Sequence, residues 1–352
     1  MAPFSCMYYV TLRCNSRCVY CDIWSDSECK SSGDANPAEV RQNLDGLKKL
    51  GVRYIDFTGG EPLLCEALPE ILGMAKEKGF RTGLVSNGVL YPRRAKELAG
   101  KVDSLSFSLD GANQETHNSQ RGIKGFGKVI ESLELAKSLG EPVDINCTVT
   151  NQNYLQLPEM VKLAQDIKVP VYLNPAFSYF GNDQLNAEIS KELERYFKEP
   201  YVIVNLAGVR FAAKGGNDIR KPRCRAIGSV VVVNWDNQIL LPCYHQAFKR
   251  VPINGDIYAA YTSAEVQEMA AQVGKWDFCQ NCTIWCYMGP SFLHKVDGYF
   301  FLYAYSMLKA GKEVYLNGHK RQPDPSVWEQ YRPQKPTREP AREPAVELTM
   351  VR

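Results

Sequence analysis

Residues 54–86, YIDFTGGEPLLCEALPEILGMAKEKGFRTGLVS, contain one complete strand–helix–strand unit. Tyr54–Thr58 and Thr82–Ser86 are short apolar runs of the length of a buried strand. Between them, Ala67–Lys78 is amphipathic, because its apolar residues recur at the spacing of one helix face. These residues are Leu68, Ile71, Leu72 and Ala75. The stretch therefore predicts two parallel strands joined by a helix.

The same alternation extends over the first half of the chain. Further strands are expected at Met7–Leu12, Ser104–Leu109, Asp144–Thr150 and Val169–Leu173. Further helices are expected at Pro37–Leu50, Arg93–Ala99, Gly127–Leu139 and Leu157–Ile167. Six strand–helix units in series predict an α/β fold, a partial (β/α)6 barrel of the TIM type. Its active site is expected at the carboxyl ends of the strands.

The pattern changes after about residue 198. Val202–Asn205 and Ser229–Gln238 are interpreted as antiparallel strands, with a hairpin turn at Asp236-Asn237. We therefore expect a barrel over residues 1–200 and a small β-hairpin/α domain over 201–300. A C-terminal helix and connector is expected over 301–321. A proline-rich, flexible tail over 322–352 follows it, and this tail is expected to contain a short helix near Val327–Tyr331.

Composition excludes several classes of protein. With 45% hydrophobic and 23% charged residues, the 352-residue chain is not wholly disordered. Its net charge of +3 gives no electrostatic case for nucleic-acid binding. No apolar run reaches the ~18 residues of a spanning helix, and no secretory signal pattern follows Met1. A cytoplasmic protein is therefore expected. Because that compartment keeps thiols reduced, the 12 cysteines indicate metal or redox chemistry instead of disulfides.

Three cysteines lie in the loop directly after the first expected strand, at Cys14, Cys18 and Cys21. Thiolates are the soft ligands that iron–sulfur clusters select. Structural zinc would require a fourth protein ligand, and the nearest candidates are Asp22 and Cys29. An iron–sulfur cluster is therefore preferred, with a zinc knuckle or unrelated buried cysteines as the alternative.

This CxxxCxxC loop, together with Thr58-Gly59-Gly60-Glu61-Pro62 at the end of the second strand, resembles the signature of the radical S-adenosylmethionine (SAM) enzymes. The resemblance implies a [4Fe–4S] cluster on Cys14, Cys18 and Cys21, with its fourth iron open to SAM. It also implies that Glu61 and its two glycines bind the amino group of the methionine moiety. Gly59 and Gly60 would let the backbone approach a ligand closely.

Further polar residues at strand ends match the cofactor-binding motifs of the same family. The resemblance implies that these residues contact the nucleoside and methionine parts of SAM, and that Arg121 holds the SAM carboxylate. They are Ser86, Asn87, Ser108, Asp110, Arg121 and Asn146. The activity implied is one-electron cleavage of SAM to a 5′-deoxyadenosyl radical, which abstracts hydrogen from an unactivated carbon. The sequence singles out no catalytic acid or base.

A second group of cysteines comprises Cys224, Cys243, Cys279, Cys282 and Cys286. It resembles the shorter, twitch form of the twitch/SPASM extensions, which implies one auxiliary [4Fe–4S] cluster. A four-cysteine zinc site is the alternative. Cys286 either replaces Cys224 or Cys279 as a ligand or lies free. The remaining four cysteines, Cys6, Cys29, Cys65 and Cys147, are expected to be buried apolar residues.

The layout resembles that of tetrapyrrole-modifying family members. It is similar to bacteriochlorophyllide C-7 methyl hydroxylases, which implies oxidation of a 7-methyl toward a 7-formyl group. The alternatives are a twitch-type sugar or aminocyclitol dehydrogenase, a peptide-modifying enzyme, and a non-catalytic iron–sulfur carrier or zinc scaffold. The expected partners are a small-molecule substrate, here a chlorin, and an electron donor such as ferredoxin or flavodoxin.

Overall fold

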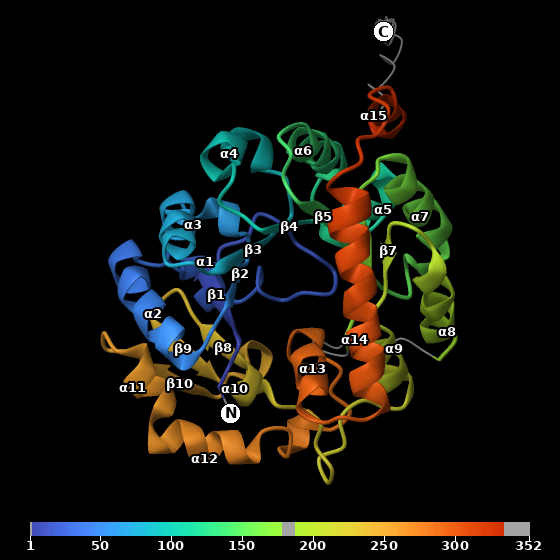
Figure 1. Ribbon diagram of the computed structural model, residues 1–352. Coiled ribbons are helices and arrows are strands. Elements are labelled where there is room, and N and C mark those ends of the chain that lie inside the picture. Colours follow the sequence, from blue (N-terminus) through green and yellow to red (C-terminus); the bar gives the residue numbers. More distant parts are fainter. Residues whose placement is uncertain (1, 178–186, 334–352) are drawn as a thin grey trace, which may run out of the picture.

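The computed structural model describes residues 2–177 and 187–333, which form a curved ten-stranded sheet with helices around its outside (Figure 1). The sheet order is β10-β9-β8-β1-β2-β3-β4-β5-β6-β7. The strands are β1 Ser5–Thr11, β2 Tyr54–Gly59, β3 Arg81–Ser86, β4 Ser104–Ser108, β5 Val143–Val149, β6 Val171–Pro175, β7 Val202–Ile203, β8 Val230–Val233, β9 Gln238–Leu241 and β10 Lys249–Pro252.

The helices fall into two groups along the chain. Those of the first half are α1 Ser27–Ser31, α2 Pro37–Leu50, α3 Leu68–Glu77, α4 Tyr91–Leu98, α5 Gln114–Arg121, α6 Phe126–Ser138, α7 Leu157–Asp166 and α8 Ala187–Arg195. Those of the second half are α9 Leu206–Ala213, α10 Ala226–Ser229, α11 Ile257–Thr262, α12 Ala264–Gln272, α13 Trp285–Ser291, α14 Gly298–Gly311 and α15 Val327–Tyr331.

The predicted barrel is confirmed, because strands β1 to β6 pair in parallel in chain order. One strand direction is wrong: β7, expected to be antiparallel, pairs in parallel with β6. Like the earlier strands, β7 follows a helix, so the chain returns in the same direction as before. The hairpin at Asn237 (φ 58°) is confirmed, but β8 also pairs in parallel with β1 and so extends the barrel sheet.

The two faces of the sheet differ in the polarity and burial of their side chains. On the outer face, side chains such as Ile55 and Phe57 of β2 are fully buried against the helices. Because side chains alternate along a strand, Tyr54, Asp56 and Thr58 point to the concave face. Most side chains on that face are polar and partly exposed: Tyr54, Asp56, Ser104, Ser106, Asn146, Thr148, Tyr172 and Asn174. The concave face of the barrel is therefore largely polar, and we call the region that this face bounds the channel.

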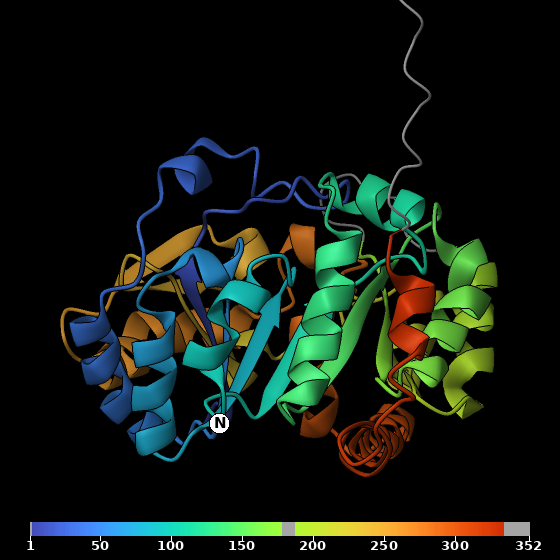
Figure 2. The same ribbon diagram turned by 90° about the horizontal axis from the view of Figure 1, so that it is seen from above.

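The second half of the chain packs on the open side of the barrel. Helix α14 runs along α9 and contacts β7, while α13 packs against α9 and α10 (Figure 1). Figure 2 shows the segment between β1 and α2 (blue) projecting beyond the sheet. The short predicted helix Val327–Tyr331 is confirmed as α15, whereas residues 334–352 of the predicted tail lie outside the described residues. Within the described part, no helix is long and apolar enough to span a membrane.

Candidate active site

The three-cysteine loop after β1 is fastened to the end of helix α5. The backbone N–H groups of Arg17 and Val19 donate to the carbonyls of Arg121 and Gln120, each at 3.0 Å. Gly122 ends α5 in the left-handed region (φ 59°), and a Cβ there would lie 2.3 Å from the Arg17 carbonyl oxygen. The loop conformation is therefore set by contacts from a helix about 100 residues further along the chain.

The thiols of Cys14, Cys18 and Cys21 line one cavity at the carboxyl ends of the strands, with an empty volume of about 640 Å³. Six of the nine predicted cofactor residues line the same cavity: Gly59, Gly60, Ser86, Asn87, Ser108 and Arg121. Burial raises the pKa of Cys14 to about 11 and that of Cys21 to about 12, so these thiols are protonated near neutral pH. A bound metal centre would have to displace those protons.

The cavity fits an iron–sulfur cluster together with SAM. Three soft donors lie on one wall, and hydroxyl, amide and guanidinium groups lie on the others. The Arg121 guanidinium donates to the Cys18 sulfur at 3.4 Å. Within residues 2–177 and 187–333, no three Cys, His, Asp or Glu side chains converge tightly enough to hold a single metal ion.

Gly59 and Gly60 bring the end of β2 against the backbone that leads into the cysteine loop. A Cβ on Gly59 would lie 2.0 Å from the Thr11 carbonyl oxygen, and one on Gly60 would lie 2.4 Å from that of Arg13. The N–H groups of Gly60 and Glu61 donate to those same two carbonyls, at 3.0 and 2.8 Å. The close approach that the glycines allow is therefore to β1, at the rim of the cavity.

Glu61 is buried just behind the cavity and does not line it. Its carboxylate accepts hydrogen bonds from the Ser86 hydroxyl at 2.8 Å and from the backbone N–H groups of Asn87 at 2.7 Å and Leu63 at 3.0 Å. Asn87 in turn donates to Asn15 at 2.6 Å and to Ser16 at 3.0 Å, both in the cysteine loop. Glu61 thus ties the end of β3 to the end of β2 and, through Asn87, to the thiols.

Asp110 supports Arg121 from outside the cavity. Its Oδ2 lies 2.8 Å from Nε of Arg121 and accepts from the Tyr20 hydroxyl at 2.5 Å. Its Oδ1 accepts from the Thr148 N–H at 2.8 Å. Asn146 also does not line the cavity, and its side-chain oxygen accepts from Asn174 at 2.8 Å in the channel. The predicted set therefore divides into six cavity-lining residues, the supporting residues Glu61 and Asp110, and Asn146, which lies apart from the cavity.

Two carboxylates in the channel were not predicted. Burial raises the pKa of both Asp56 and Asp144 to about 7. Asp144 accepts from the Ser106 hydroxyl, while Oδ1 of Asp56 has no hydrogen-bond partner among the described residues. Gly83 leaves room for Asp56, because a Cβ there would lie 2.6 Å from that oxygen. An aspartate inside an expected buried strand is the sequence signal that could have identified both residues.

The second group of cysteines lines a separate cavity, with an empty volume of about 770 Å³. Cys224, Cys243, Cys279 and Cys282 all contribute to its wall. Burial raises the pKa of Cys224 to about 12 and that of Cys279 to about 11. Cys286 does not line this cavity and is exposed on α13.

Asn217 connects the segments around this second cavity, and sequence reasoning did not identify it. Its side-chain oxygen accepts from the N–H groups of Arg223 at 2.9 Å and Cys224 at 3.2 Å. Its side-chain nitrogen donates to the carbonyls of Gly274 at 2.9 Å and Cys279 at 3.1 Å. Its backbone N–H donates to the carbonyl of Cys282 at 3.0 Å. One buried amide thus joins the segments that carry three of the four cysteines.

An aromatic group separates the two cavities. Tyr9, on the concave face of β1, stacks on Tyr244 with ring centroids 4.0 Å apart. The backbone N–H of Tyr244 donates to the Tyr287 hydroxyl at 2.9 Å, and Tyr287 lines the second cavity. The same apolar cluster includes Ile23, which lines the first cavity, and Cys243, which lines the second. The two cavities are therefore connected through one apolar cluster.

Comparison with known proteins agrees with this geometry. Residues 8–164 match the family described as the radical SAM superfamily. An Fe-coproporphyrin III synthase of Methanosarcina barkeri is 31% identical over 54% of this chain and 48% of its own length. An AdoMet-dependent heme synthase of the same organism is 32% identical over 49% of this chain and 50% of its own length. The chain thus spans about half the length of these curated relatives.

Solved structures share the fold at low sequence identity. Streptococcus suis SuiB bound to S-adenosylmethionine matches with a TM-score of 0.63 and 16% identity, over 77% of this chain and 68% of SuiB. Native anSMEcpe with bound AdoMet matches with a TM-score of 0.62 and 18% identity, over 89% of this chain and 98% of that one. The radical SAM superfamily binds a [4Fe–4S] cluster and SAM, the cofactor pair that the first cavity fits. Residues 8–164 of this chain are therefore a domain of the radical SAM superfamily.

Proposed function

We propose that this chain is a radical SAM oxidoreductase that oxidises an unactivated carbon of a small molecule bound in the channel. The observation that carries the proposal is that one apolar cluster connects the two cysteine cavities, because its Ile23 lines the first cavity and its Cys243 lines the second. A substrate in the channel would have a radical source on one side and an electron acceptor on the other.

When bound, the cluster and SAM supply a 5′-deoxyadenosyl radical, which takes a hydrogen atom from the substrate. In this proposal Cys14, Cys18 and Cys21 hold the cluster, and Arg121 orients the SAM carboxylate. Glu61 keeps Ser86 and Asn87 in place at the cavity wall. The stacked pair Tyr9 and Tyr244 belongs to the apolar cluster that lies between the two sites.

We propose that the second cavity holds one auxiliary [4Fe–4S] cluster on Cys224, Cys243, Cys279 and Cys282. The support is that four thiols line one cavity, which a shared apolar cluster connects to the first cavity. Oxidation of a carbon that has lost a hydrogen atom releases one further electron, which this cluster would accept. A four-cysteine zinc site is the alternative, and it could not take up an electron.

Tetrapyrrole oxidation is the first candidate reaction, specifically conversion of the 7-methyl group of a bacteriochlorophyllide toward 7-formyl. It is supported by relatives named as an Fe-coproporphyrin III synthase and a heme synthase. A specific observation favours a second candidate, a sugar or aminocyclitol dehydrogenase. Asp56 and Asp144 face the channel, and carboxylates recognise hydroxyl and ammonium groups. A non-catalytic carrier is disfavoured, because it needs no cavity for SAM beside its cluster.

Anaerobic reconstitution of the chain with iron and sulfide, followed by dithionite and SAM, tests the proposal. Release of 5′-deoxyadenosine is expected from the wild-type chain and not from a Cys14→Ala, Cys18→Ala, Cys21→Ala variant. Release that survives these substitutions would refute the assignment of the first site. About four irons remaining in the triple variant would support the auxiliary cluster, whereas zinc alone would refute it. Product formation with a bacteriochlorophyllide or with an aminocyclitol separates the two candidate reactions.

A further inference from the structure

The strongest concentration of charge on the chain surrounds one ligand of the second site. Residues 214–225 contain five Lys or Arg residues and one Asp, a net charge of +4, whereas the whole chain carries +3. The basic residues are Lys214, Arg220, Lys221, Arg223 and Arg225. Cys224 lies between the last two. This charge is therefore local to the second site and is not a general property of the protein.

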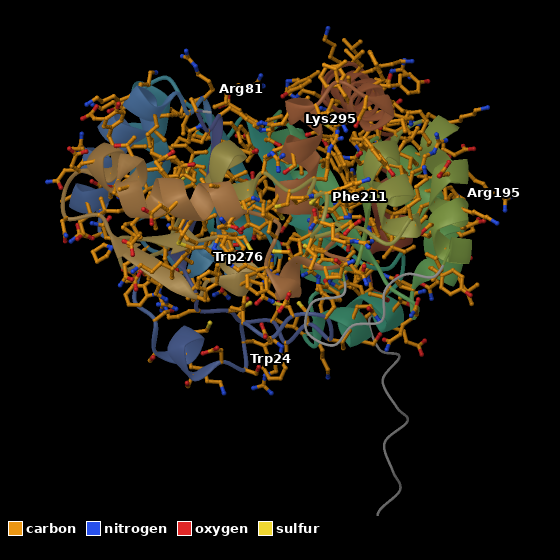
Figure 3. The ribbon with its side chains drawn as sticks, turned by 90° about the horizontal axis from the view of Figure 1, so that it is seen from below. Trp24, Arg81, Arg195, Phe211, Trp276 and Lys295 are labelled. Carbon is orange, nitrogen blue, oxygen red and sulfur yellow. The ribbon has the colours of Figure 1, made fainter. Side chains whose placement is uncertain are left out.

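Part of this charge lines a surface cavity of its own. Lys221, Arg223 and Arg225 line it together with Lys295 and His294, and Asp297 is the one acidic side chain in its wall. The empty volume is about 650 Å³. Figure 3 shows Lys295 and Phe211, another lining residue, close together on this side of the molecule. We call this cavity and its rim the basic surface.

Most of the positive charge of the basic surface is not neutralised. Asp297 pairs with Arg223, whose side chain is largely buried. Arg225 donates to the carbonyl oxygens of Cys224 at 2.9 Å and Pro222 at 3.3 Å, so its positive charge has no carboxylate beside it among the described contacts. Lys221 and Lys295 are exposed, and no ion pair is found for either within the described residues. The surface is thus arranged to receive anionic groups.

The basic surface and the second cavity share a wall. Cys224 lines the second cavity, while its chain neighbours Arg223 and Arg225 line the basic surface. Two apolar side chains flank Lys295: Leu293 is 43% exposed and Val296 is 72% exposed. A basic rim with exposed apolar side chains beside a redox site has the features of a transient protein interface.

We infer that the basic surface is the docking site of an acidic one-electron carrier protein, which exchanges electrons with the second site. This inference rests on the proposed auxiliary cluster. In the balanced step, the reduced cluster loses one electron to the oxidised carrier, and no proton or bond is exchanged. Opposite charges would steer the encounter and fix its orientation, and the association rate would fall steeply with salt.

The test uses a plant-type [2Fe–2S] ferredoxin as the probe and the Cys14→Ala, Cys18→Ala, Cys21→Ala chain, which keeps only the second site. The chain is reduced, and its oxidation by excess ferredoxin is followed in a stopped-flow instrument at low and high salt. K221E/K295E reverses two exposed charges of the basic surface. R93E/K96E is the matched control, because Arg93 and Lys96 are exposed on α4, on the outside of the barrel.

The rate constant is expected to fall at least tenfold in K221E/K295E and at high salt, and to remain at the wild-type value in R93E/K96E. Oxidation by a small neutral oxidant should proceed equally in all variants. Equal ferredoxin rates in both charge-reversal variants, or no effect of salt, would overturn the docking inference.

Titration calorimetry of ferredoxin onto the full-length chain separates this inference from the proposed function. If the second site holds zinc, the auxiliary cluster fails, while salt-sensitive binding lost in K221E/K295E would still support docking. If iron is present but binding is unchanged in K221E/K295E, docking fails alone. Binding of a short DNA duplex in place of ferredoxin, with the same dependence on Lys221 and Lys295, would also overturn the inference.

Discussion

The carboxylate of Glu61, at the end of β2, accepts a 2.7 Å hydrogen bond from the backbone N–H of Asn87, at the end of β3. Because Asn87 also bonds to Asn15 and Ser16, this contact links the GGEP turn to the cysteine loop through one side chain. Glu61 therefore acts on the cofactor cavity as a positioning residue, from behind the wall. Its effect can be separated from cofactor chemistry by measuring the protein without cofactors.

Glu61→Gln is expected to destabilise the cofactor-free chain by about 1–3 kcal/mol. Three donors converge on the two carboxylate oxygens, and a glutamine would turn an N–H₂ group toward at least one of them. Anaerobic urea unfolding measures the loss. Glu66→Gln is the matched control, because Glu66 is exposed, and a change below about 0.5 kcal/mol is expected there. Equal stability of the two variants would contradict the positioning role.

The channel carboxylates predict that the stability of the chain falls as pH rises. Burial raises the pKa of Asp56 and Asp144 to about 7, above the ~3.9 expected for an unfolded chain. At pH values between these two pKa values, the folded state binds more protons than the unfolded state. The free energy of unfolding therefore decreases as the pH rises through this range. Asp56→Asn should reduce this fall by at least about 1 kcal/mol between pH 4.5 and 7.

Urea unfolding of the cofactor-free chain at several pH values measures this difference. Asp45→Asn, at an exposed position on α2, serves as the control and should keep the wild-type slope. A wild-type slope in Asp56→Asn would show that Asp56 is already ionised at low pH and would contradict its raised pKa.

Asn217→Ala is expected to remove the iron of the second site. The substitution deletes four side-chain hydrogen bonds to the segments that carry Cys224 and Cys279, and it leaves buried N–H and carbonyl groups without these partners. In the Cys14→Ala, Cys18→Ala, Cys21→Ala background, the iron content should fall from about four per chain to near zero. Gln272→Ala, at an exposed position of α12, should retain the iron.

The features that sequence predicted are those that depend on local pattern. The alternation of buried strands and amphipathic helices gave the six parallel strands, and helix Pro37–Leu50 was predicted with its observed bounds. The cysteine loop could be located because three thiols at short spacing are a rare pattern. The four cysteines expected to be buried apolar residues, Cys6, Cys29, Cys65 and Cys147, are all buried.

The features that sequence missed depend on contacts between distant segments. The direction of β7 is set by its pairing with β6, which the two residues Val202 and Ile203 do not encode by themselves. Asn217 was overlooked because its partners lie up to 65 residues away. The motif predicts that Glu61 binds the amino group of SAM, which stays a prediction. Its hydrogen bonds from Leu63, Ser86 and Asn87 could not be predicted, because they appear only in the folded chain.

Cys286 provides the last prediction, because spacing alone left five cysteines for four ligand positions. Cys282 precedes α13 and lines the second cavity, whereas Cys286 lies within the first turn of α13 and does not line it. In the Cys14→Ala, Cys18→Ala, Cys21→Ala background, Cys286→Ala should therefore retain about four irons, while Cys282→Ala should lose them. Iron and sulfide analysis with Mössbauer spectroscopy distinguishes the two variants. Loss of iron in Cys286→Ala together with retention in Cys282→Ala would reverse the assignment, and Cys286 would replace Cys282 as the ligand that α13 brings to the second site.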